Sequence, residues 1–179
     1  RLQGSRARPA SIRLDDSYGA TRIWPKPEPG LPPALGRAML TSAGEGAMAM
    51  PGYAGAIRYR RAAGEDRPVF TTIPIDQFAD PQMAPLMAPA VSGRYVLIGG
   101  SLVDVDRVET PFTSVDGLSR PGIEIHAEML SQMLDHAQLP HTTNQFLWPQ
   151  VILVVLAAAL TGLIEMRSWK FISLLALQA

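Results

Sequence analysis

The feature that most constrains this chain is a stretch of 19 residues, 146–164, without a single charged side chain. A helix needs about 20 mostly apolar residues to cross the hydrocarbon core of a bilayer. Trp148 lies near the start of the stretch and Trp169 just past its end, where aromatic residues often meet the membrane interface. A buried core helix is the alternative, but such helices are commonly shorter or amphipathic. The sequence therefore predicts a transmembrane helix over residues 146–164.

The flanks of this stretch predict its orientation. Arg167 and Lys170 lie in the short connection 165–170, and basic residues favour the cytoplasmic side of a membrane. A second apolar run starts at 171–179 and is expected to begin another span of a longer protein. We therefore expect a multi-pass protein of the cell membrane, with residues 1–145 as an extracytoplasmic domain.

Composition excludes several classes of function. The chain has 16 Lys plus Arg and 16 Asp plus Glu, so its formal net charge is zero, which argues against nucleic acid as a partner. It contains no cysteine, which excludes thiol catalysis, disulfides and cysteine-ligated zinc or iron–sulfur sites. Neither a nucleotide-binding glycine motif nor a hydrolase nucleophile motif occurs, so we expect no cofactor and no catalytic residues in this chain.

Ordered structure is expected to begin near residue 56. Residues 56–60 and 69–73 are rich in β-branched and aromatic side chains and are separated by turn residues, which predicts a hairpin. Residues 94–98 form a short apolar run that is typical of a buried strand and ends at two glycines.

An amphipathic helix is expected over residues 122–136. Its apolar positions form one narrow stripe that is expected to pack on the sheet: Ile123, Ala127, Leu130 and Leu134. Strand, loop and packing helix in this order predict an α/β fold with a mixed sheet, packing helices and a C-terminal transmembrane helix.

One group of side chains merits testing as a ligand-binding site: Asp104, Asp106, Glu109 and His126. Carboxylates at this spacing can share a calcium ion, but the loop lacks the glycine and the final glutamate of an EF-hand. Two carboxylates can also perform acid–base chemistry where their environments differ. A hydrogen-bonded structural histidine is the simpler interpretation of His126, and no metal site is predicted.

The order of motifs in this region resembles a known family. Residues 93–99 read Gly-Arg-Tyr-Val-Leu-Ile-Gly; an acidic loop and Thr110-Pro111 follow, and residues 121–128 read Pro-Gly-Ile-Glu-Ile-His-Ala-Glu. This series is similar to the extracytoplasmic CHASE sensor domain of type two, over about residues 55–140. Arg94 stands where the family more often has lysine.

The resemblance implies an outer sensor joined through membrane helices to a cytoplasmic output outside this chain. In the family that output is commonly a class III adenylate or guanylate cyclase, and sometimes a protein kinase. It further implies a homodimeric receptor that responds to a small molecule or to stress. No ligand-binding residue carries over, and the glycines, prolines and Thr110 of the motif are expected to set the shape of the chain. The alternative is a membrane-anchored extracytoplasmic binding protein or enzyme without cytoplasmic output.

Overall fold

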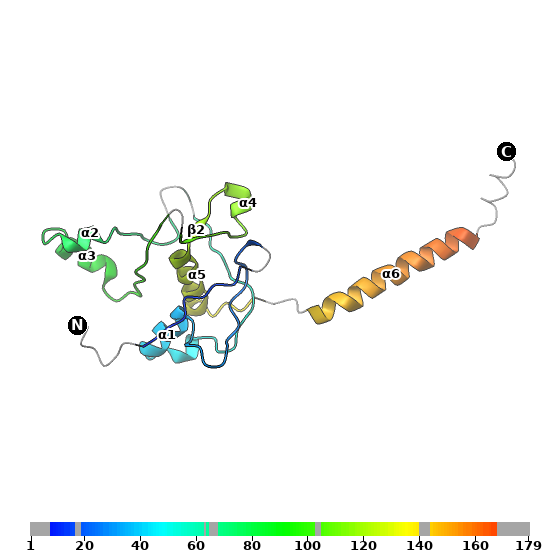
Figure 1. The fold of residues 1–179 in the computed structure, drawn as a ribbon, viewed down its shortest axis with the longest axis horizontal. Coiled ribbons are helices and arrows are strands. Elements are labelled where there is room, and N and C mark those ends of the chain that lie inside the picture. The colour runs from blue at the N-terminus through cyan, green and yellow to red at the C-terminus, as the bar shows by residue number, and fades with distance from the viewer. Residues whose placement is uncertain are drawn as a thin grey trace. The chain divides into compact units, whose positions relative to one another are not determined.

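The computed structural model describes residues 8–16, 19–62, 64, 68–102, 105–139 and 144–167 (Figure 1). Within the last range, side chains are described for residues 147–162. The chain divides into two compact units, Arg1–Pro140 and His141–Ala179, and each is considered by itself.

The first unit is a mixed α/β structure with more helix than strand. Its elements are α1 (Leu35–Ser42), the 3₁₀ turn η2 (Gly46–Met48), α2 (Asp76–Ala79), α3 (Ala84–Val91), β1 (Arg107–Val108), α4 (Thr113–Asp116), β2 (Arg120–Pro121) and α5 (Gly122–Leu134). The antiparallel pair β1–β2 aligns Arg107 with Pro121 and Val108 with Arg120. Three single-residue bridges join Ser11 to Ala34, Asp15 to Ile23 and Ile23 to Ala56. The predicted α/β character is thus confirmed at this level.

The core of this unit forms around α5, which lies between α1 and the β2–α4 region in Figure 1. Trp24 and Leu40 are fully buried and pack with the inner face of the helix. Gly36 lets α1 approach closely, because a Cβ atom there would lie 2.6 Å from Met133 Cε. Burial of these large apolar side chains is the main favourable contribution to folding.

The inner face of α5 differs from the predicted stripe. Ile125, Met129 and Met133 are 1%, 2% and 0% exposed, whereas Leu134, a member of the predicted stripe, is 38% exposed. Of the predicted stripe, Leu130 is in the core, at 3% exposed. The rest of the prediction was wrong because apolar residues occur on more than one side of this helix, so periodicity alone could not select the side that meets Trp24 and Leu40.

Two further predictions are absent from the described residues: the hairpin of 56–60 with 69–73, and the strand 94–98. Most of the turn that would connect the two hairpin strands lies outside the described residues. Residues 95–101 make no main-chain to main-chain hydrogen bond with any other described residue. Tyr95 and Leu97 pack against the core, but Ile98 is 76% exposed. Hydrophobic contact thus positions this segment without the ladder of hydrogen bonds that defines a strand.

The second unit contains α6 (Asn144–Arg167), a helix that includes the whole uncharged stretch 146–164. It begins two residues before that stretch, so Pro149 lies in the second turn of the helix. Over the residues that the structure describes, no helix meets the length and hydropathy required of a membrane span.

The core geometry predicts unequal costs for two neighbouring truncations on α5. Met133→Ala should lower the free energy of unfolding by about 2–5 kcal/mol, because it leaves a cavity between α1 and α5. Leu134→Ala should cost less than about 1 kcal/mol, because this side chain is substantially exposed. Urea unfolding of the 179-residue chain measures both values, and equal costs would contradict the observed core face.

Candidate functional site

The structure brings together two of the four predicted site residues. The Asp106 carbonyl accepts a hydrogen bond from the Gly122 N–H at 3.1 Å, so Asp106 lies at the start of α5. His126 is 4% exposed, and its Nε2 donates to the Ile12 carbonyl at 3.1 Å. Burial lowers the pKa of His126, while the Ile12 carbonyl and the charge of Asp106 oppose that shift. His126 is thus a hydrogen-bonded residue of the core.

The other two predicted residues are not both described. Asp104 lies outside the described residues. Glu109 is exposed, and its main-chain carbonyl accepts a hydrogen bond from the Thr21 N–H at 2.8 Å. No group of three or more histidine or acidic side chains among the described residues could hold a metal ion.

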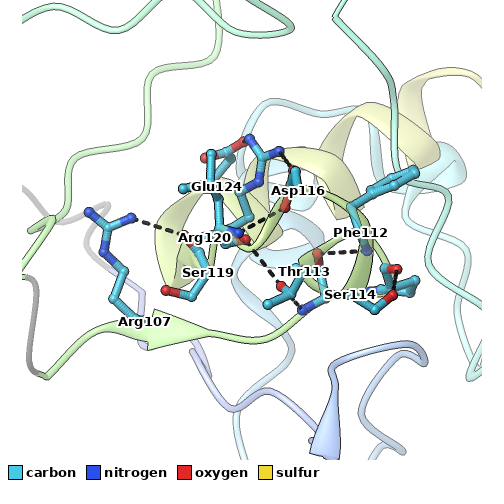
Figure 2. Close-up of polar contacts among 11 residues, drawn as sticks. Arg107, Phe112, Thr113, Ser114, Asp116, Ser119, Arg120 and Glu124 are labelled. Atoms are coloured by element: carbon cyan, nitrogen blue, oxygen red, sulfur yellow. Dashed lines mark hydrogen bonds and ion pairs between the residues drawn. The ribbon is translucent and has the colours of Figure 1, made fainter.

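Polar contacts order the loop that precedes α5 (Figure 2). The Arg120 guanidinium lies between two carboxylates, 2.8 Å from Asp116 and 3.4 Å from Glu124. The Leu118 N–H donates to Asp116 Oδ1, and this bond and then Arg120 hold the pKa of Asp116 below its usual range. Gly117 has φ +71°, the left-handed conformation that glycine adopts readily at the end of a helix.

The hydroxyl of Thr113 and the buried Thr110 shape the same loop. The Thr113 hydroxyl accepts from the Thr110 N–H at 3.0 Å and donates to the Leu118 carbonyl at 3.1 Å. Thr110 Oγ1 accepts from the Phe112 N–H at 3.2 Å. Arg107 donates to the Ser119 carbonyl at 3.0 Å, across the β1–β2 pair. Side chains thus satisfy main-chain groups that so short a sheet leaves without partners.

Gln132 lies on the buried side of α5 and is 1% exposed. Its side chain has five hydrogen-bond partners among the described residues, of which the Tyr53 hydroxyl accepts from Gln132 Nε2 at 3.3 Å. Its Oε1 accepts from Trp24 Nε1 at 3.0 Å and from the Arg58 N–H at 3.1 Å. Its Nε2 donates to the carbonyls of Ala56 at 3.1 Å and Ala137 at 2.9 Å. A buried amide with this many partners fixes the position of every group that it joins.

Glu128 lies one helical turn before Gln132 and is 3% exposed. Its Oε1 accepts from the Arg60 N–H at 3.2 Å, but its buried Oε2 has no hydrogen-bond partner among the described residues. Burial raises the pKa of Glu128 to about 7, against the opposing effect of Arg60. Burial and then the charge of Glu128 also raise the pKa of Tyr59, whose hydroxyl donates to the Thr21 carbonyl at 2.6 Å.

Together, Glu128 and Gln132 act on residues 56–60 as a neighbouring strand would. Residues 56, 58 and 60 alternate along an extended segment, and side chains four positions apart on α5 meet their main-chain groups. We call this contact between Glu128, Gln132 and residues 56–60 the polar seam. The start of the segment also pairs with the main chain near residue 23, through the Ile23–Ala56 bridge and the Ile57 N–H, which donates to the Arg22 carbonyl at 2.8 Å.

The carboxyl end of α5 is tied to the same region. His136 has φ +50°, and the N–H groups of His136 and Ala137 bond to the carbonyls of Met133 and Gln132, which is a Schellman motif. The Tyr53 hydroxyl then accepts from the Leu139 N–H at 3.1 Å and donates to the Ala56 carbonyl. Leu139, which follows α5, is thereby held next to Tyr53 and Ala56, where the extended segment of the polar seam begins.

Sequence reasoning missed the polar seam because Glu128 shares a flank of α5 with the polar residues Glu124 and Asp135, and such a flank is ordinarily solvated. One signal was present. Glu128 and Gln132 are four residues apart and directly precede Met129 and Met133, so they share a side of the helix with core positions.

Comparison with known protein families shows to which family the chain belongs. A model of the CHASE2 domain matches residues 9–164, which is most of the chain. The chain belongs to the CHASE2 domain family. No curated protein and no solved structure matches it. The match begins far before residue 55, so the early segments that pack around α5 belong to the CHASE2 domain as well.

Close packing explains why residue 99 of the motif is a glycine in this CHASE2 domain. A Cβ atom on Gly99 would lie 2.9 Å from both Cβ and Cγ1 of Ile123, in the first turn of α5. A Cβ atom on the adjacent Gly100 would meet Leu102 at an ordinary 3.8 Å. The backbone at residue 99 therefore approaches α5 more closely than a residue with a side chain allows.

These two glycines provide a matched test. Gly99→Ala should lower the free energy of unfolding by about 1–3 kcal/mol, because the branched Ile123 cannot easily give way. Gly100→Ala should be neutral or slightly stabilising, because it restricts the unfolded chain without a clash. Denaturant midpoints of the two variants measure the difference. Equal midpoints would show that the backbone at Gly99 does not pack tightly against Ile123.

Proposed function

We propose that this CHASE2 domain is the outer sensory part of a transmembrane receptor, and that residues 146–164 carry its signal across the membrane. CHASE2 is an extracellular sensory domain of signalling proteins. The observation that carries the proposal is the extent of the family match, which includes α5 and the whole uncharged stretch in one family unit. The 19 uncharged residues of this stretch support the proposal, because a membrane span needs about 20 mostly apolar residues.

The proposed route of the signal follows the chain from α5 to α6. Leu139 is held by Tyr53, and Asn144 begins α6 only five positions later. A stimulus that changes the contact of α5 with residues 56–60 would act on Leu139 through this arrangement. A coupling of about 1–3 kcal/mol between stimulus and output is enough for a response of 5–150-fold.

The output that this proposal favours is a class III adenylate or guanylate cyclase in the cytoplasm, in a homodimeric receptor of several membrane helices. The connection 165–170 would then be cytoplasmic, and 171–179 would begin the next span. The stimulus is a small molecule or a stress acting on residues 1–145. The resemblance of residues 93–128 to the family supports this assignment.

Because the chain contains no cysteine, single cysteines introduced at chosen positions can test its orientation in the membrane. Ser92 is exposed at the end of α3, and Ser168 follows α6 in the sequence. In spheroplasts, a membrane-impermeant maleimide should label Ser92→Cys at once and Ser168→Cys only after the membrane is permeabilised. Labelling of both variants without permeabilisation, or of neither, would contradict the proposed topology.

A chimaera tests whether the domain controls an output. We would fuse a cyclase catalytic domain after Lys170 and compare nucleotide formation with and without residues 1–139. Removal of the domain should change the activity at least about fivefold. Four Gly and Ser residues inserted after Leu139 should give the activity of the shortened fusion, because the inserted segment uncouples α5 from α6.

The same insertion after Gly93 is the matched control, because residues 92–94 are exposed and far in sequence from the exit of α5. This control should keep the activity of the unaltered fusion. If the insertion after Leu139 also keeps that activity, the signal does not pass through the proposed route.

A further inference from the structure

We propose that Glu128 is a proton-binding site of the sensor, and that its protonation state sets the strength of the contact between α5 and residues 56–60. This inference deepens the proposed function and rests on it for the side of the membrane that supplies the proton. The stimulus at this site would be the acidity of the extracytoplasmic fluid.

The first argument is geometric. Glu128 is 3% exposed, and among the described residues only one of its two carboxylate oxygens has a hydrogen-bond donor. An ionised carboxylate requires donors on both oxygens to offset the loss of water. Thr21 Oγ1, a hydroxyl oxygen on the residue whose carbonyl bonds to Tyr59, is likewise buried without a partner among the described residues. Glu128 Oε2 itself has no donor in that part of the chain to stabilise an ionised carboxylate.

The charged surroundings do not remove this deficit. Arg60 and Arg120 favour the ionised form of Glu128, and Glu124 on the same helix opposes it. The Arg60 and Arg58 guanidinium groups are bound to Asp135, at 2.5 Å and 3.3 Å. From residues 56–60, Glu128 receives a main-chain N–H and faces the neutral phenol of Tyr59. Burial thus dominates over the neighbouring charges.

The sign of the pH effect follows from the direction of the shift. Burial raises the pKa of Glu128 from 4.5 to about 7, so the closed seam binds a proton that a solvated carboxyl would release. The stabilising effect of this proton is complete below pH 4.5 and is lost as the pH rises through 7. Above that value the ionised Glu128 favours conformations in which α5 has separated from residues 56–60 and water reaches the carboxylate.

Hydrogen exchange at the Arg60 amide measures this contact directly, because that N–H donates to Glu128. We would follow the full 179-residue chain in lipid nanodiscs from pH 5 to 8.5, with exchange rates corrected for their intrinsic pH dependence. Protection of Arg60 should fall by up to about tenfold per pH unit toward pH 7 and level off above it.

Two substitutions separate the site from general effects of pH. Glu128→Gln supplies a neutral side chain with its own donor, so protection of Arg60 should no longer vary with pH. Glu109→Gln, on an exposed residue, should preserve the response of the unaltered chain. A pH-independent Arg60 amide in the unaltered chain, or an unchanged response in Glu128→Gln, would overturn the proposal.

A measurement on the unaltered chain covers the case in which Glu128→Gln fails to fold. Carbon-13 resonances of the glutamate carboxyl groups should include one that titrates near pH 7. If all of them titrate between about pH 4 and 5, Glu128 is an ordinary carboxylate and the proposal is wrong. Neither measurement depends on the maleimide labelling, so a failure of the membrane topology and a failure of the proton site are distinguishable.

Discussion

The amide of Gln132 is the interaction on which the first unit most depends. It joins the indole of Trp24, the extended segment at Ala56 and Arg58, and the exit of α5 at Ala137. Each of these groups is in the core or next to it. Leaving one of them without a hydrogen bond would therefore lower the free energy of unfolding by about 1–3 kcal/mol. The positions of three chain segments that are distant in sequence are thus fixed by one side chain on α5.

This contact also explains why a domain with strand-like segments has so small a sheet. Extended residues with free main-chain groups need partners, and another strand is the usual source. Here Glu128 and Gln132 supply those partners to residues 56–60, and the hydroxyl of Thr113 does so in the loop before α5. The helix is therefore both the centre of the core and a substitute for a strand. A change in the charge of Glu128 acts on this same contact.

The degree to which the sequence predicted the site differs from residue to residue. Helix α5 and the helical character of 146–164 were predicted from local pattern, and both are present. Asp106 and His126, which the sequence grouped in one candidate site, both lie near the start of α5, where His126 donates to the Ile12 carbonyl. Glu128 was not foreseen, because a glutamate near other polar residues is expected to be solvated.

By itself, the sequence determined the features that depend on neighbouring residues: the long uncharged stretch, the start of α5 after Pro121-Gly122, and the series of motifs that marks a CHASE2 domain. The tertiary structure alone decided which side of α5 is buried and that residues 56–60 pair with a helix. These outcomes depend on contacts such as Trp24 with Gln132, which are 108 positions apart. Local periodicity carries no information about such distant partners, because it reports only the residues within a few turns of one another.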